Sequence, residues 1–146
     1  MASASREEQE LRKLSVELRY FEQSAEVLQQ RLTMMNAAVA DLSYANATLE
    51  GIEKEKENAE ILVPIGGSNH IKVKLADTNR VIVGMGAGVS VEKTLPEAKE
   101  IIKQRIEGLE KTRISAQQQL GQVVDRINQG RTRMETLLAG LREGKQ

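Results

Sequence analysis

The chain has 146 residues and equal numbers of basic and acidic side chains, 21 of each, so it is the size of one domain and has no net charge to attract a polyanion. It has no cysteine and a single histidine, which excludes a disulfide framework, a thiolate zinc site and a histidine-built metal site. No stretch reaches the roughly 18 consecutive apolar residues of a membrane span, and the N-terminus lacks the apolar core of a signal peptide. We therefore expect a soluble, cytoplasmic protein with no cofactor, no metal, no nucleic-acid partner and no membrane partner.

The first segment, residues 1–58, carries a long heptad repeat. Apolar side chains recur at alternating steps of three and four, and Asn46 is the only polar member of the series. The series is Leu11, Leu14, Leu18, Phe21, Ala25, Leu28, Leu32, Met35, Val39, Leu42, Asn46 and Leu49. A repeat sustained beyond three or four heptads is typical of a coiled-coil helix. Ser5 and Glu8 form a capping-box pattern, so we expect the helix to begin near residue 5 and to end within residues 50–58.

The last segment, residues 94–146, carries a second heptad series, with Arg113 and Gly130 as its exceptions. The series is Ile102, Ile106, Leu109, Arg113, Ala116, Leu120, Val123, Ile127, Gly130, Met134, Leu137 and Leu141. Thr94 and Glu97 form another capping box, and Pro96 falls in the first turn, where its missing N–H costs little. A second coiled-coil helix is therefore expected to begin near residue 95.

The two predicted helices have matching lengths and a short connection, which favours an antiparallel hairpin coiled coil. If the chain folds back about the middle of the connection, residues whose numbers sum to about 151 should lie at one level. Phe21, the only phenylalanine, would then face the Gly130 region. A large side chain against a small one is what interdigitation needs.

The middle segment, residues 59–93, contains short β-branched stretches at 61–65, 70–75, 81–85 and 89–93, separated by turn residues. This pattern predicts four strands in two hairpins. Alternation places the apolar side chains on one face: Ile61, Val63, Ile65, Ile71, Val73, Leu75, Val81, Val83, Met85, Val89 and Val91. Because the helices use their apolar seams on each other, we expect nothing inside the chain to cover this face, and isolated hairpins are marginal in water. The sequence therefore predicts an α+β fold: a long antiparallel hairpin coiled coil with two central β-hairpins that assemble into an inter-subunit β-barrel hub.

No cluster of catalytic residue types is present, so we expect no enzyme and no catalytic residues. The glycine-rich stretch at 84–88 continues as a strand and opens no helix, which favours a hairpin turn over a dinucleotide-binding loop. Asp77-Thr78-Asn79 lacks the glycine and glutamate of a calcium loop, and His70 has no catalytic neighbour at a readable spacing. Asn46 either specifies the register or partner of the coiled coil or meets water or a carbonyl.

Two motifs in the strand segment point to a family. Residues 62–66 (LVPIG) open the strands and residues 83–94 (VGMGAGVSVEKT) close them, between two coiled-coil helices. On these residues the chain resembles the α class of prefoldin subunits, of the archaeal type, and two hairpins rather than one favour this class over the β class. The resemblance implies an ATP-independent chaperone subunit in a hexamer of two α-class and four β-class subunits. It also implies that the complex captures unfolded proteins at the coiled-coil ends and delivers them to a group II chaperonin.

Apolar side chains near both termini are candidates for client binding, because helices fray at their ends and flexible Leu and Met surfaces suit promiscuous contacts. They are Leu11, Leu14, Val16, Met134, Leu137, Leu138 and Leu141. Val16 and Leu138 lie off the strict seam and are the better candidates. Two other functions stay open at this point: a structural protein that polymerises into filaments, and an adaptor that is not a chaperone.

Overall fold

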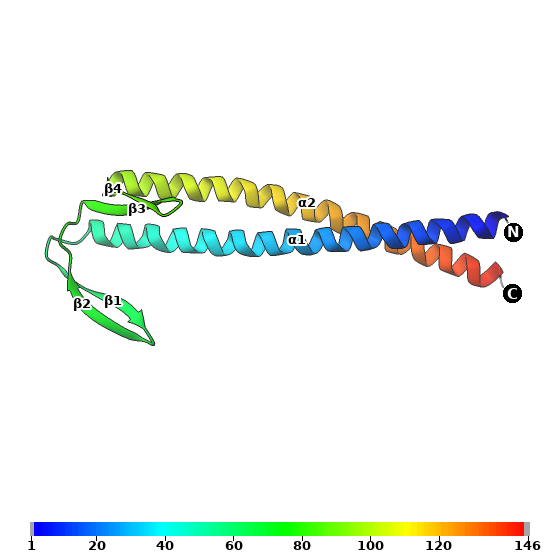
Figure 1. Cartoon of the computed structure of the whole chain (residues 1–146), viewed down its shortest axis with the longest axis horizontal. Coiled ribbons are helices and arrows are strands. Elements are labelled where there is room, and N and C mark those ends of the chain that lie inside the picture. Colours follow the sequence, from blue (N-terminus) through cyan, green and yellow to red (C-terminus); the bar gives the residue numbers. More distant parts are fainter. Residues whose placement is uncertain (1, 145–146) are drawn as a thin grey trace. The chain divides into compact units, whose positions relative to one another are not determined.

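The structure is a computed structural model that describes the backbone of residues 2–144 and the side chains of residues 6–144. Two long helices enclose four short strands in the sequence (Figure 1). The elements are α1 (Ala2–Glu53), β1 (Glu60–Gly66), β2 (Asn69–Lys74), β3 (Arg80–Gly86), β4 (Val89–Thr94) and α2 (Leu95–Gly144). The predicted order of one helix, four strands and one helix is confirmed.

The two helices differ in how well their starts were predicted. Helix α1 begins at Ala2, three residues before Ser5, so the predicted start is wrong. The reason is that residues 2–10 include no glycine or proline to stop the helix; the side chain of Ser5 lies outside the described residues. Helix α2 begins at Leu95 as predicted, because the Thr94 hydroxyl accepts a hydrogen bond from the Glu97 amide at 3.3 Å and the Glu97 carboxylate accepts one from the Thr94 amide at 3.4 Å.

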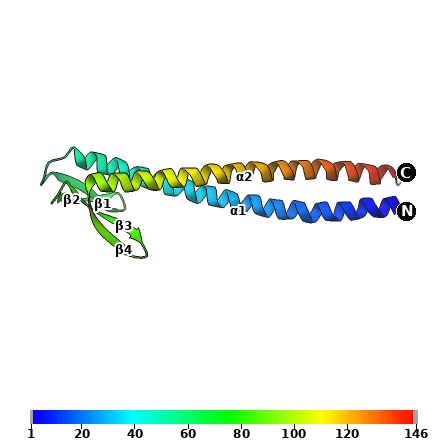
Figure 2. The same ribbon diagram turned by 90° about the horizontal axis from the view of Figure 1, so that it is seen from above.

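The strands form two antiparallel hairpins, β1–β2 and β3–β4, in separate two-stranded sheets (Figure 2). Each hairpin turns through two residues with positive φ, Gly67 and Ser68 in the first and Ala87 and Gly88 in the second. Positive φ at both central residues is the type I′ geometry that matches the twist of hairpin strands. The hairpin interpretation of residues 84–88 is therefore confirmed.

Contacts divide the chain into two compact units, the first made of residues 1–37 and 111–146 and the second of residues 38–110. Within each unit, α1 and α2 run antiparallel beside each other (Figures 1 and 2). Every position of both heptad series is buried or half-buried. The core of the first unit consists of Leu18, Leu28, Leu32, Ala116, Ile127 and Leu137. The predicted antiparallel coiled coil is thus confirmed.

The predicted levels hold for two ion pairs between the helices but not near the termini, where Arg133 bonds Glu10 and their numbers sum to eight less than expected; the partner of Gly130 is also different. Glu22 pairs with Arg131 and Glu53 with Lys99, and both pairs lie within two residues of the expected sum. Leu18, rather than Phe21, is the large side chain beside Gly130: a Cβ added to the glycine would lie 2.7 Å from Leu18 Cδ2. Leu18 is the seam residue that precedes Phe21, three positions earlier in the chain. The difference arises because the level of two residues along the helices does not determine which seam side chain points at the glycine.

The second unit has a small core in which a hairpin joins the two helices. Val83 of β3 is only 6% exposed and packs with Leu49 of α1 and with Ala98 and Ile102 of α2. The expectation that nothing inside the chain covers the hairpin face is therefore wrong for β3–β4. Ala98 is fully buried, and this small side chain leaves room for the strand to approach the helices.

Candidate assembly and docking surfaces

The β1–β2 hairpin carries about half of the predicted apolar face. Its register pairs Ile61 with Val73 and Val63 with Ile71, so these four side chains share one face as predicted. Ile61, Val63 and Val73 are half-buried, as is Leu75 beyond the end of β2, whereas Ile71 is 47% exposed. The opposite face carries the Glu60–Lys72 ion pair and exposed Leu62.

Both hairpins contain an irregularity that the alternation rule did not predict. The register shifts between Pro64 and Gly66 in β1 and between Gly84 and Gly86 in β3, so Ile65 and Met85 are the extra residues of two bulges. A bulge inserts one residue and re-aims its side chain, so simple alternation no longer determines the face. Ile65 is 60% exposed and Met85 is 48% exposed.

The tip of the β3–β4 hairpin is held to helix α2 by Arg105. The guanidinium Nη2 donates a hydrogen bond to the carbonyl of Gly84 at 2.8 Å and lies 3.8 Å from Met85 Sδ. Val81 is half-buried beside the core, whereas Val89 and Val91 of β4 stay exposed. The predicted assembly residues of this hairpin therefore divide into side chains used within the chain and side chains open to a partner.

An exposed apolar side chain on the other face of β3 was missed by the sequence analysis. Ile82 is 76% exposed and lies opposite Glu92 in the hairpin. A groove nearby is lined by side chains of α1, α2 and β3, among them Leu42, Tyr44 and Ile82. The alternation rule assigns Ile82 to the polar face, so the rule alone does not identify it. A large apolar side chain at a position expected to be polar is the sequence feature that indicates a contact surface.

The seven predicted client-binding side chains differ in exposure. Val16 is 71% exposed and Leu138 is 39% exposed, as expected for positions off the seam. Leu137 is only 5% exposed and belongs to the core. The four remaining seam residues are half-buried: Leu11, Leu14, Met134 and Leu141.

Three further exposed apolar side chains on α1 were missed: Tyr20, Val27 and Met34, which are 65%, 48% and 72% exposed. Tyr20 also packs edge to face against Phe21, with ring centroids 5.7 Å apart. These three residues are spaced seven apart, a regularity that could have identified them in the sequence. It was missed because the first heptad series already explained the helix.

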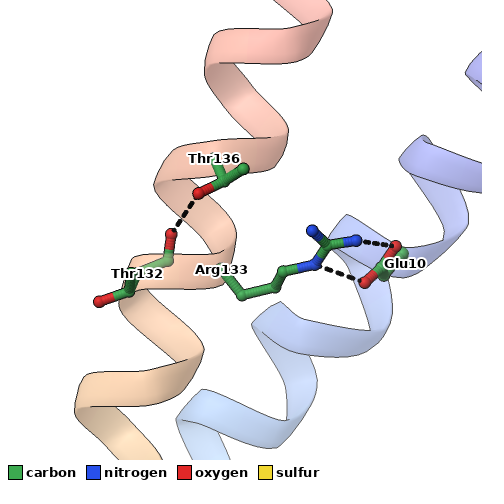
Figure 3. Close-up of polar contacts among 4 residues, drawn as sticks. All are labelled: Glu10, Thr132, Arg133 and Thr136. Atoms are coloured by element: carbon green, nitrogen blue, oxygen red, sulfur yellow. Dashed lines mark hydrogen bonds and ion pairs between the residues drawn. The ribbon is translucent and has the colours of Figure 1, made fainter.

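Charged pairs connect the helices near the termini. Arg133 of α2 donates two hydrogen bonds to the carboxylate of Glu10 on α1, at 2.9 and 3.2 Å (Figure 3). These hydrogen bonds hold the pKa of Glu10 below its ordinary value and raise the pKa of Arg133. In the same region, the Thr136 hydroxyl donates to the backbone carbonyl of Thr132, which satisfies the hydroxyl within α2.

Asn46, His70 and Asp77, which the sequence singled out, lie on a helix, a strand and a turn. Asn46 is half-buried, and its amide donates to the Glu50 carboxylate at 3.5 Å. His70 is exposed on β2, and Asp77 accepts a hydrogen bond from the amide of Asn79, as in a turn. Among the described residues, no group of three or more His, Cys, Asp or Glu side chains is arranged to hold a metal ion. No helix within residues 2–144 is long and apolar enough to cross a membrane.

The chain has two long antiparallel helices with a pair of hairpins between them in the sequence, and both hairpins have exposed apolar side chains. These features are those of a coiled-coil subunit that assembles with other chains. The profile of the family described as prefoldin subunit matches residues 21–140. The chain belongs to this family, which is a family of chaperones and not of enzymes.

Individual relatives are similar in sequence to this chain over most of its length. A prefoldin subunit alpha of Methanopyrus kandleri is 35% identical over 113 residues, which are 77% of this chain and 72% of the relative. A prefoldin subunit alpha of Methanococcoides burtonii is 34% identical over 134 residues, 92% of this chain and 89% of the relative. The fold is shared with a solved chain described as filamentous PFD from Methanocaldococcus jannaschii, at a TM-score of 0.69 and 24% identity, covering 79% of this chain and 95% of that one.

Proposed function

We propose that this chain is the α-class subunit of an ATP-independent holdase that captures unfolded proteins and delivers them to a group II chaperonin in the cytoplasm. Its assembly partners are β-class prefoldin subunits, in a hexamer of two α-class and four β-class chains. The observation that carries the proposal is the exposure of Val16 and Leu138 close to the ends of the two helices, in a chain of a chaperone family. Capture needs neither a nucleotide nor a catalytic group.

The hairpins supply the assembly surface of this proposal. Ile71 and Leu62 of β1–β2, and Val89 and Ile82 of β3–β4, leave apolar area in water that a neighbouring subunit can cover. The outer strands of two-stranded sheets also carry unpaired backbone N–H and C=O groups, which favour pairing with strands of another chain. Closing these edges between subunits produces the β-barrel hub.

The client surface lies near the termini in this proposal. Apolar side chains exposed on α1 and α2 can contact any unfolded segment, because burial of apolar surface is non-directional. Contacts with single side chains such as Val16 are weak, so capture relies on several arms acting at once, which raises the overall affinity. Release to a chaperonin then requires only that these weak contacts be broken one by one.

Truncation of the arms tests the proposal. Two complexes with β-class subunits are prepared. In the first, residues 1–16 and 132–146 of this chain are removed; in the second, the full-length chain carries the paired changes Val16→Ser and Leu138→Ser. Light scattering should show that both complexes suppress aggregation of a chemically unfolded protein less well than the unchanged complex, while adding ATP alters nothing. The matched control is Ile114→Ser, which removes an apolar side chain that is 49% exposed away from the termini. Equal protection by all variants would contradict client binding at these arms.

A filament is the second candidate, and one observation favours it. The solved chain that shares the fold comes from a structure described as filamentous PFD. Hairpin edges that close a ring with β-class subunits can instead propagate without closure when only one kind of chain is present. Electron microscopy of this chain alone and with a β-class partner distinguishes the two: closed particles with the partner support the chaperone complex, and filaments in both samples support the alternative.

A further inference from the structure

Helix α1 carries a second row of side chains at heptad spacing, on the face away from the seam with α2. We call it the outer stripe. It consists of Val16, Tyr20, Gln23, Val27, Gln30 and Met34. At about 100° per residue, these side chains lie on the side of the helix roughly opposite the buried residues Leu18 and Leu32. The four apolar members are between 48% and 72% exposed, and all six belong to the first unit.

A hollow opens on the outer stripe. It is lined by Tyr20, Gln23, Ser24, Val27, Leu28 and Arg31. The first four of these residues have the spacing i, i+3, i+4 and i+7, which is the hole that receives one side chain of a facing helix in knobs-into-holes packing. The outer stripe therefore has both the period and the relief of a coiled-coil seam, although no described residue of α2 occupies it.

We propose that the outer stripe packs against the outer stripe of a second copy of this chain, as a parallel, in-register pair of α1 helices. Each side chain then faces its own equivalent, so that Val27 meets Val27 of the second copy and Met34 meets Met34. Gln23 of the second copy enters the hollow, where Ser24 and the Tyr20 hydroxyl can accept hydrogen bonds from its amide. Polar side chains in a seam reduce stability but fix the register of a pair.

The flanking charges favour this orientation. In a parallel pair, the residue before one stripe position faces the residue that follows the next stripe position on the other helix. Glu26, which precedes Val27, then faces Arg31 of the second copy, which follows Gln30. Both side chains are exposed in the single chain. The two-fold symmetry makes this attractive pair occur twice.

The outer stripe covers fewer than three heptads and contains two glutamines, so the pair is weak and forms between copies held close together. Pairing covers Val16, so it competes with client capture at that position. This consequence rests on the proposed function, whereas the pairing itself does not.

Disulfide trapping tests the pairing, because the chain has no cysteine of its own. Under mild oxidation, the Val27→Cys chain should form an interchain disulfide at least tenfold faster than Gln29→Cys, an exposed position on the other side of α1. Equal rates would overturn the proposal. A second result would also overturn the proposal: the double variant Gln23→Cys and Val27→Cys forms the interchain disulfide, whereas Val27→Cys alone forms none. That pattern indicates antiparallel helices, in which position 23 of one chain faces position 27 of the other.

A charge exchange distinguishes the specific helix pair from non-specific hydrophobic association. In the Val27→Cys background, Glu26→Arg places like charges against Arg31 of the second copy, and trapping should slow by about threefold to tenfold at low salt. Adding Arg31→Glu should restore the rate, because the exchanged charges attract again. If the second change restores nothing, the two side chains do not face each other and the proposed register is wrong. Neither readout depends on chaperone activity.

Discussion

Replacing Gly130 with alanine tests the close contact between α1 and α2 in the first unit. In an open helix interior, glycine to alanine stabilises a protein by about 0.5 to 1 kcal/mol, because alanine has the higher helix propensity. At Gly130 the new Cβ would lie 2.7 Å from Leu18 Cδ2 and 3.2 Å from Leu18 Cγ. Carbon atoms prefer a separation of about 3.5 to 4 Å, so Leu18, which is only 7% exposed, must move within the core.

The gain in helix propensity and the cost of overpacking oppose each other, and their sizes decide whether Gly130→Ala stabilises or destabilises the chain. Overpacking a core costs about 1 to 3 kcal/mol, so we expect Gly130→Ala to destabilise the chain by about 1 kcal/mol. The control is Gly121→Ala on the same helix, where an added Cβ meets nothing within 4 Å. It should stabilise the chain, which leaves a difference of about 2 kcal/mol between the variants.

Thermal unfolding followed by circular dichroism at a fixed protein concentration measures the difference, which corresponds to several degrees in the melting temperature. A double-mutant cycle isolates its cause. In a Leu18→Ala background the clash is absent, so Gly130→Ala should become stabilising, with a coupling energy of about 2 kcal/mol. If Gly130→Ala is as stabilising as Gly121→Ala in the unchanged chain, Leu18 does not approach Gly130 closely and the reasoning fails.

Three further outcomes are expected. Val83→Ala should destabilise the chain by about 2 kcal/mol in urea unfolding, whereas Ile82→Ala, at a residue 76% exposed, should change it little; equal effects would contradict the packing of β3. The folded-state pKa of Glu10 is lowered by Arg133, so the pair stabilises above the ordinary pKa near 4.5 and its contribution is lost as the pH falls through the lowered pKa. Acid titration of unfolding should therefore show a smaller loss of stability in Arg133→Gln than in the unchanged chain, and identical profiles would refute the coupling. Arg105→Met should speed amide hydrogen exchange at the β3–β4 tip and leave exchange in the helices unchanged.

Much of the fold follows from local patterns in the sequence. Heptad spacing predicted the burial of Leu18, Leu32 and Ile127 correctly, because a helix places residues three and four apart on one face whatever it packs against. The Thr94 cap and the two hairpin turns were equally readable, since their geometry depends only on residues within a few positions. Exposure of Val16 followed from its place off the seam.

Other features depend on which surfaces meet. Alternation gave β3 an apolar face but could not show that Val83 packs on Leu49 and Ala98, because that contact joins residues far apart in the sequence. The bulge at Met85 changed the direction of a side chain that strict alternation had assigned. The outer stripe was hidden because one helix carried two heptad series, and only the burial of the first showed that the second stays open.

The sequence by itself thus determined the elements, their ends to within a few residues, and the seam of the coiled coil, because these depend on backbone periodicity and short-range hydrogen bonds. The tertiary structure alone decided that Leu18 meets Gly130, that β3 docks on the helices through Val83, and that Tyr20 and Met34 remain in water. These facts depend on the relative placement of distant residues, which is set by the fit of whole surfaces and not by any local pattern.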